Sequence, residues 1–153
     1  MTKIPLKLYK TSGQWMIYSY ITVMPHGVHA RPVPIKFLVD TGSPWIAISP
    51  KDAIKLNIPI LRLPKAAEHK TIVFAGDKFE RRLLSNTDLY LRDEKGEVIK
   101  INLDSISVLK PTKRISEKIK HIPSVLGCDF LTTSKFRLCF DPSNEEGFLE
   151  KDE

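Results

Sequence analysis

One short segment of the sequence combines the residue types that acid-base chemistry needs. Asp40, Thr41, Gly42 and Ser43 directly follow the apolar run Phe37-Leu38-Val39. A carboxylate at the end of a buried strand is costly unless something requires it there. A threonine hydroxyl can lock the loop by hydrogen bonding, and glycine permits a tight backbone whose N–H groups face the carboxylate. The same residue types also form ordinary turns, so the tetrapeptide alone leaves a catalytic carboxylate and a simple turn equally open.

A second motif lies far downstream and is of a different kind. Val125-Leu126-Gly127 is an apolar pair followed by glycine, and Asp129 comes two residues later. Two motifs in this order and spacing are more specific than either one alone. Together they resemble the retropepsin-like aspartic proteases, the group of retroviral and retroelement proteases and their cellular relatives. The resemblance runs from about Trp15 to Asp141.

The resemblance implies both a fold and a set of site residues. The fold would be mainly β, a closed β-barrel-like acid protease (retropepsin) fold with one or two short helices and half an active site per chain. Catalytic roles would fall to Asp40, Thr41 and Gly42. The implied substrate-binding residues, three of them at the tip of a mobile flap hairpin, are Ser43, Trp45, Ala75, Gly76, Asp77 and Gly127. From the residues alone, the tryptophan suits a substrate pocket and the core equally well.

The number of Asp-Thr-Gly loops bears on how a complete site would form. The chain has one such loop in 153 residues, whereas pepsin-like enzymes carry two, one in each of two lobes. A single carboxylate cannot serve as both acid and base, so the resemblance implies a homodimer in which Asp40 of each chain meets on a twofold axis. Thr41 would then form hydrogen bonds across the dimer.

The chemistry of such a pair follows from electrostatics. Two carboxylates within about 3 Å of each other share one proton. The ionised member takes a proton from water, which attacks the peptide carbonyl, while the protonated member donates to the carbonyl oxygen. The expected substrate is an extended peptide or protein segment recognised largely through backbone pairing. This mechanism needs no metal and no organic cofactor.

The sequence departs from the retroviral pattern beside the second motif. Retroviral members usually carry arginine after the late glycine, paired with an aspartate near the active loop, but Cys128 stands at that position here. The alternative function is a non-catalytic dimerising or peptide-binding module with the same fold. The intact Asp40-Thr41-Gly42 segment argues against this module, because a loop freed from catalysis has little need of a buried aspartate.

The elements that must position these residues are mostly strands. Aromatic and β-branched residues predict strands at 15–23, 33–39, 46–48, 70–79, 87–91, 99–109, 125–127 and 136–140. Ser49 as cap and Pro50 in the first turn predict a short helix that ends before Pro59. Helical turns are expected at 129–134 and within 110–121, where Ile115 and Ile119 have helical spacing. We expect one domain over residues 1–142 and a loose polar tail over 143–153.

The remaining composition excludes several classes of function. The net charge is +6, but the lysines are scattered and no basic stretch is interleaved with aromatic residues, so nucleic-acid binding is not predicted. No segment is apolar for long enough to cross a bilayer or to serve as a signal peptide, and we expect a cytoplasmic protein.

Cys128 and Cys139 fit no zinc motif and are expected to be reduced thiols. His26 and His29 lack acidic or cysteine neighbours and are expected to be exposed turn residues without a metal.

Overall fold

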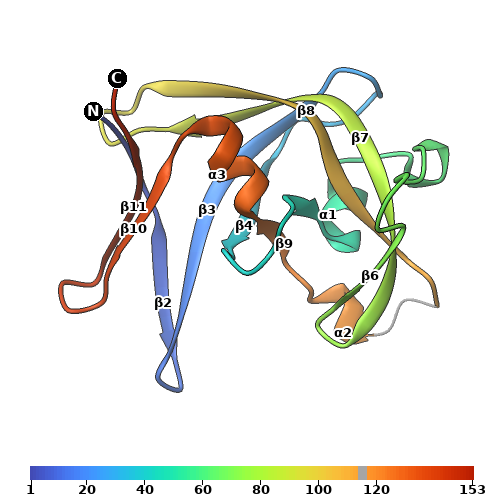
Figure 1. Ribbon diagram of the computed structural model, residues 1–153, viewed down its shortest axis with the longest axis horizontal. Helices are drawn as coiled ribbons and strands as arrows, with labels where there is room; N and C mark the ends of the chain where they lie inside the picture. Colours follow the sequence, from blue (N-terminus) through green and yellow to red (C-terminus); the bar gives the residue numbers. More distant parts are fainter. Residues whose placement is uncertain (114–116) are drawn as a thin grey trace.

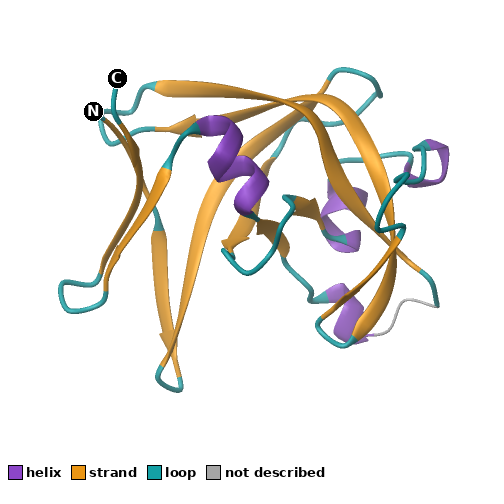
Figure 2. Cartoon of the chain, in the orientation of Figure 1, coloured by secondary structure: helices purple, strands orange, loops and turns teal. Residues whose placement is uncertain are grey.

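Strands dominate the computed structural model, which describes residues 1–113 and 117–153 (Figures 1 and 2). In this part of the chain the strands are β1 (Thr2–Pro5), β2 (Lys7–Thr11), β3 (Gln14–Pro25), β4 (Pro34–Val39), β5 (Ala47–Ile48), β6 (Thr71–Phe74), β7 (Asp77–Arg92), β8 (Val98–Pro111), β9 (Ser124–Leu126), β10 (Arg137–Asp141) and β11 (Glu146–Lys151). The helices are α1 (Pro50–Lys55), the 3-10 turn η1 (Ile60–Arg62), α2 (Glu117–Lys120) and α3 (Cys128–Ser134). The predicted mainly β class is confirmed.

The larger sheet closes on itself. Its strand order is β2-β3-β4-β9-β5-β8-β7-β6, and β3 also pairs with β7. The strands from β3 to β7 in this order therefore form a closed circuit of pairings around the core. Side chains that alternate along the strands fill its interior, and Ile21, Ile35, Phe37 and Leu89 are fully buried there.

The parallel pairing of β4 with β9 is the part of this circuit that matters most for function. Phe37 lies opposite Ser124 and Val39 opposite Leu126. Because the two strands run in the same direction, Asp40 and Gly127 emerge at the same end of the sheet. The two motifs found in the sequence are thus neighbours in space.

Helix α1 is fixed to β9 by a buried polar cluster. The Ser49 hydroxyl accepts the Asp52 N–H at the start of the helix, and Pro50 occupies its first turn, as predicted. The Ser124 hydroxyl accepts the Ser49 N–H at 2.9 Å and donates to the Asp52 carboxylate at 2.6 Å. These hydrogen bonds fix the segment that follows the Asp40 loop against the strand that precedes Gly127.

The C-terminal segment corrects one prediction. We expected a loose chain beyond Pro142, but β11 is the central strand of a second sheet, between β1 and β10. Leu149 lies opposite Ile4 and is fully buried. The apolar pair Phe148-Leu149 is short and flanked by acidic residues, so its strand character depends on partners at both ends of the chain. Strands β1 and β2 were also missed by the sequence analysis.

The region before β9 is only partly described. Ile115, one of two isoleucines with helical spacing, lies outside the described residues, whereas Ile119 on α2 is buried beside Phe79, Leu109 and Ile122. Among the helices of the described residues, none is both long and apolar enough to span a bilayer.

Candidate active site

The Asp40 loop is a tight turn built on hydrogen bonds of its own backbone. The Asp40 N–H donates to Leu126 O of β9 at 3.0 Å, which continues the β4–β9 pairing into the loop. The Gly42 N–H donates to Asp40 Oδ1 at 2.9 Å, and the Ser43 N–H donates to Asp40 O at 3.1 Å. The carboxylate is half-buried, while Thr41 and Gly42 are exposed. The loop thus presents an oriented carboxylate at the protein surface.

Gly127 lies directly beneath this loop. A Cβ atom at position 127 would come within 2.4 Å of Trp45 O and 2.7 Å of Ser43 O. The residues after it hold the loop from the same side, since Cys128 N–H donates to Ser43 O at 2.9 Å and Asp129 N–H donates to Pro44 O at 3.2 Å. The structure therefore assigns Gly127 to the support of the loop, where only a glycine leaves enough room.

Asp129, which belongs to the second motif, is a further support for the loop, although the sequence predicted no role for it. Its Oδ1 accepts the Ile46 N–H at 2.6 Å and the Phe130 N–H at 2.7 Å. Burial raises the pKa of Asp129, while these backbone hydrogen bonds and the nearby Arg81 oppose the rise. Beside it, the Cys128 thiol contacts Thr41 O at 3.1 Å. In place of the arginine expected in retroviral members, the residues after the glycine hold the loop through a thiol and a carboxylate.

Trp45 is half-buried between a cation and an aromatic ring. The Arg81 guanidinium lies 4.4 Å from the centre of the tryptophan ring, and the His69 ring lies 5.3 Å from it. Arg81 in turn donates to Glu68 O at 2.8 Å and to the Ser107 hydroxyl at 3.1 Å. A buried arginine thus connects the tryptophan to β8 and to the segment before β6. Arg81 stands between two other charged residues in the sequence, so its burial against the tryptophan could not be predicted from the sequence.

The predicted flap is a real hairpin with a two-residue turn. Ala75 has φ 53° and Gly76 has φ 82°, as the mirror-image turns of tight hairpins require. Asp77 at the tip pairs with Lys118 of α2 at 3.6 Å. Within the described residues, no hydrogen bond or ion pair joins this tip to the Asp40 loop, and Figure 1 shows the tip beside α2. The structure therefore brings together the candidate residues at positions 40–45 and 127 but leaves the tip apart from them.

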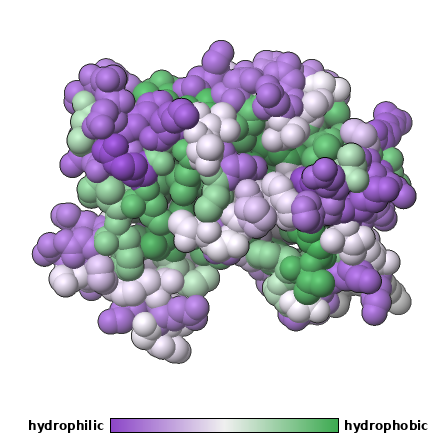
Figure 3. Space-filling model, in the orientation of Figure 1, coloured by the Kyte–Doolittle hydropathy of each residue, from purple (hydrophilic) through white to green (hydrophobic). Residues whose placement is uncertain are grey.

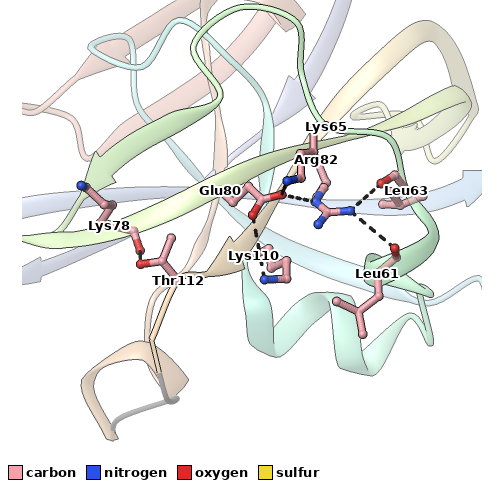
Figure 4. A network of polar contacts seen from close by, with 8 residues as sticks. All are labelled: Leu61, Leu63, Lys65, Lys78, Glu80, Arg82, Lys110 and Thr112. Atoms are coloured by element: carbon pink, nitrogen blue, oxygen red, sulfur yellow. Dashed lines mark hydrogen bonds and ion pairs between the residues drawn. The ribbon is translucent and has the colours of Figure 1, made fainter.

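The base of the hairpin is anchored more firmly than its tip (Figure 4). Glu80 accepts from Arg82 Nε at 2.6 Å and lies 3.8 Å from the Lys65 ammonium. Arg82 also donates to Leu63 O at 2.7 Å, and Thr112 donates to Lys78 O at 3.1 Å. These contacts attach the hairpin base to the residue that follows β8 and to the chain after α1, so motion of the flap would be confined to the turn end.

The histidines near the first long loop are partly as predicted. His26 is exposed, but we expected no acidic partner, and this is wrong because it pairs with the buried Asp88 of β7. The hydrogen bond from the Asn102 amide and the bond with His26 lower the pKa of Asp88. Within residues 1–113 and 117–153, no group of three or more His, Cys, Asp or Glu side chains has the arrangement of a metal site.

Asp129 provides a direct test of how the loop is held. We expect Asp129→Ala to lower the free energy of unfolding by about 3 kcal/mol, because the Ile46 and Phe130 N–H groups lose their acceptor. Asp129→Asn keeps an acceptor oxygen and should cost less than about 1 kcal/mol at pH 7. The raised pKa means that the folded chain binds this proton more tightly than the unfolded chain does. As pH rises from the pKa of Asp129 in the unfolded chain to its higher pKa in the folded chain, the parent's carboxyl therefore opposes folding increasingly. The asparagine variant lacks this contribution.

Urea unfolding of the parent and both variants at pH 4 and pH 7 measures these differences. An asparagine variant as unstable as the alanine variant would show that the negative charge, and not the acceptor oxygen, holds the loop.

Comparison with known proteins supports the assignment of the fold. No protein-family model matches the sequence, and no curated protein sequence matches it either. Among solved structures, a retropepsin-like aspartic protease from Rickettsia conorii is similar with a TM-score of 0.54 and 20% identity, over 96% of this chain and 89% of that one. EIAV protease complexed with the inhibitor HBY-793 has a TM-score of 0.49 and 16% identity, over 86% of this chain and 100% of that one. The chain has the retropepsin-like fold that its two motifs predicted.

Proposed function

We propose that the chain is an aspartic endopeptidase whose active site is formed by the Asp40 loops of two identical chains. One observation carries the proposal: a surface loop holds an oriented carboxylate directly over Gly127, in a fold of the retropepsin type. The likeness to an aspartic protease from Rickettsia conorii supports the same reaction class. The carboxylate would activate water, and its twin would protonate the peptide carbonyl oxygen.

The need for a second chain follows from the surroundings of Asp40. None of the recorded hydrogen bonds or ion pairs of the described residues joins it to another acidic side chain, and the adjoining Thr41 and Gly42 are exposed. A partner's loop would cover both and would supply the missing carboxylate. Thr41 could then form the hydrogen bonds across the dimer that the resemblance implied.

An apolar surface near the second sheet supports the same arrangement. Figure 3 shows hydrophobic side chains gathered over β2, β3 and β10. Phe140 is 37% exposed there, and its ring meets Trp15 edge to face at 5.6 Å. A contiguous exposed apolar patch, unlike single exposed residues, is typical of a surface that a partner covers.

The substrate would be an extended peptide between this surface loop and the flap. Ser43 and Trp45 flank the carboxylate and are proposed to contact the peptide, with Ala75, Gly76 and Asp77 approaching when the hairpin tip leaves α2. We also propose a cytoplasmic location, which the two free thiols at Cys128 and Cys139 support.

The pH dependence of cleavage tests the mechanism. We expect a bell-shaped profile with an acidic optimum, since one carboxyl of the pair must be ionised and the other protonated. A peptide library incubated with the protein from pH 3 to 8, with and without pepstatin, measures it. Activity that rises through pH 8, or that requires a thiol or a metal, would contradict the proposal. Peptide binding without cleavage at any pH would favour the non-catalytic module instead.

The oligomeric state gives a separate test of whether a second chain completes the active site. We expect sedimentation at tens of micromolar to show a dimer that a peptide inhibitor strengthens, because the inhibitor would contact both loops. A chain that stays monomeric with and without inhibitor, yet cleaves peptides at a rate linear in its concentration, would contradict a shared site.

A further inference from the structure

We propose a second binding site, independent of the protease function, in a cavity between β2 and β7. The geometry points to a small ligand that carries a phosphate group next to a flat ring. The site is called the seam cavity below, and the residues that define it are Lys7, Tyr18, Ser19, Tyr20, Tyr90 and Arg92.

The seam arises because two strands share one side of β3. At Tyr18, β3 pairs with Lys7 of β2 on one side and with Leu38 of β4 on the other. At Thr22, it pairs with Tyr90 of β7 on the side opposite β4. Strands β2 and β7 therefore lie on the same side of β3, and the β3 residues between Tyr18 and Thr22 have no strand partner there. A cavity of about 440 Å³ fills this gap.

The charge of the seam cavity favours an anion. Lys7 and Arg92 line it, no acidic residue does, and neither cation has a carboxylate partner among the ion pairs of the described residues. Arg92 uses Nη1 for Gly96 O at 2.9 Å, which leaves further N–H groups for a ligand. Lys36 does not line the cavity, but its ammonium group lies 4.2 Å from the centre of the Tyr18 ring. An arginine and a lysine in a cavity that no acidic residue lines are suited to a phosphate.

The aromatic side chains of the seam cavity favour a flat ring on the same ligand. Tyr18, Tyr20 and Tyr90 line it, and Tyr20 is 48% exposed. Exposed tyrosine rings stack on flat rings, and their hydroxyls can hydrogen-bond to them. The volume lies within the range of small-molecule sites. The lining residues come from β2, β3 and β7, so only the assembled fold brings them together.

Calorimetric titration of the full chain with adenosine monophosphate, inorganic phosphate and adenosine tests the site. We expect the monophosphate to bind at least tenfold more tightly than either of the other two, since only it engages both the cations and the rings. Lys7→Met and Arg92→Gln should each weaken its binding at least tenfold. Lys51→Met, an exposed lysine on α1, is the matched control and should leave binding unchanged.

Thermal unfolding of each variant shows whether the fold persists. Unchanged affinity in the folded Lys7→Met and Arg92→Gln variants, or no binding by the parent at millimolar monophosphate, would overturn the proposal. A single-stranded oligonucleotide that binds more than a hundredfold tighter than the monophosphate would also overturn it, in favour of a nucleic-acid surface. The Asp40→Asn variant should bind the monophosphate as tightly as the parent. The result for the seam cavity is therefore independent of the result for the proposed protease function.

Discussion

Asp40→Asn should lower kcat/KM for peptide cleavage at least about 10³-fold, the size of a general acid-base contribution. An amide can neither take a proton from water nor share one with its twin. The geometry of the loop should persist, because the asparagine Oδ1 can still accept the Gly42 N–H that now donates to Asp40 at 2.9 Å. Measured under the same conditions, sedimentation and thermal unfolding should show an assembled and folded variant.

The matched control for this substitution is Asp104→Asn, at an exposed position of β8. It makes the same chemical change away from the loop and should leave cleavage unaltered. If the Asp40 variant cleaves at the parent rate, another group is the catalytic carboxylate. If both variants lose activity together, the loss reflects charge or folding and not catalysis at Asp40.

Gly127→Ala should cost about 3 kcal/mol of folding free energy, at the upper end of ordinary overpacking, and should abolish cleavage. The new methyl group would meet two backbone oxygens, at 2.4 Å and 2.7 Å, and backbone atoms cannot move aside as a flexible side chain can. The displaced atoms belong to Trp45 and Ser43, so relief of the overlap shifts the loop that carries Asp40. Urea unfolding and the peptide cleavage assay measure the two effects.

Gly27→Ala is the appropriate control. Its Cβ would meet the nearest atom, the Ser85 hydroxyl, at an ordinary contact distance of 3.6 Å. We expect a change within about 0.5 kcal/mol, as for most surface substitutions. Gly127→Ala retaining both stability and activity would mean that the loop can move away from β9 without harm, contrary to its proposed support by Gly127.

Local sequence signals predicted the parts of the site that depend on local chemistry. The apolar run into Asp40, the Ser49 cap with Pro50, and the small-residue turn at Ala75-Gly76 each reflect a preference of adjacent residues. These preferences act within a few positions, so they can be read without knowing the fold. The resemblance to a known fold then supplied the proximity of Asp40 and Gly127.

The features that were missed depend on partners distant in sequence. Asp129 holds the Ile46 N–H across 83 positions, and Arg81 reaches the Trp45 ring from β7. Strand β11 contains a short apolar pair whose burial requires the strand at the opposite end of the chain. Charged residues such as Asp129 and Arg81 have no periodic pattern in the sequence, so only the assembled fold reveals which of them are paired.

The parallel pairing of β4 with β9 also bears on when the site can form during folding. The strand before Asp40 and the strand before Gly127 are separated by most of the chain, including the whole β7–β8 hairpin. Bringing the ends of so long a segment together lowers the conformational entropy of the chain before any contact between the two strands forms. This cost slows folding. A chain that has not yet emerged as far as Leu126 lacks the acceptor for the Asp40 N–H and the glycine under its loop. The carboxylate therefore acquires its geometry late, and a nascent or partly folded chain would lack the arrangement that the proposed peptide cleavage requires.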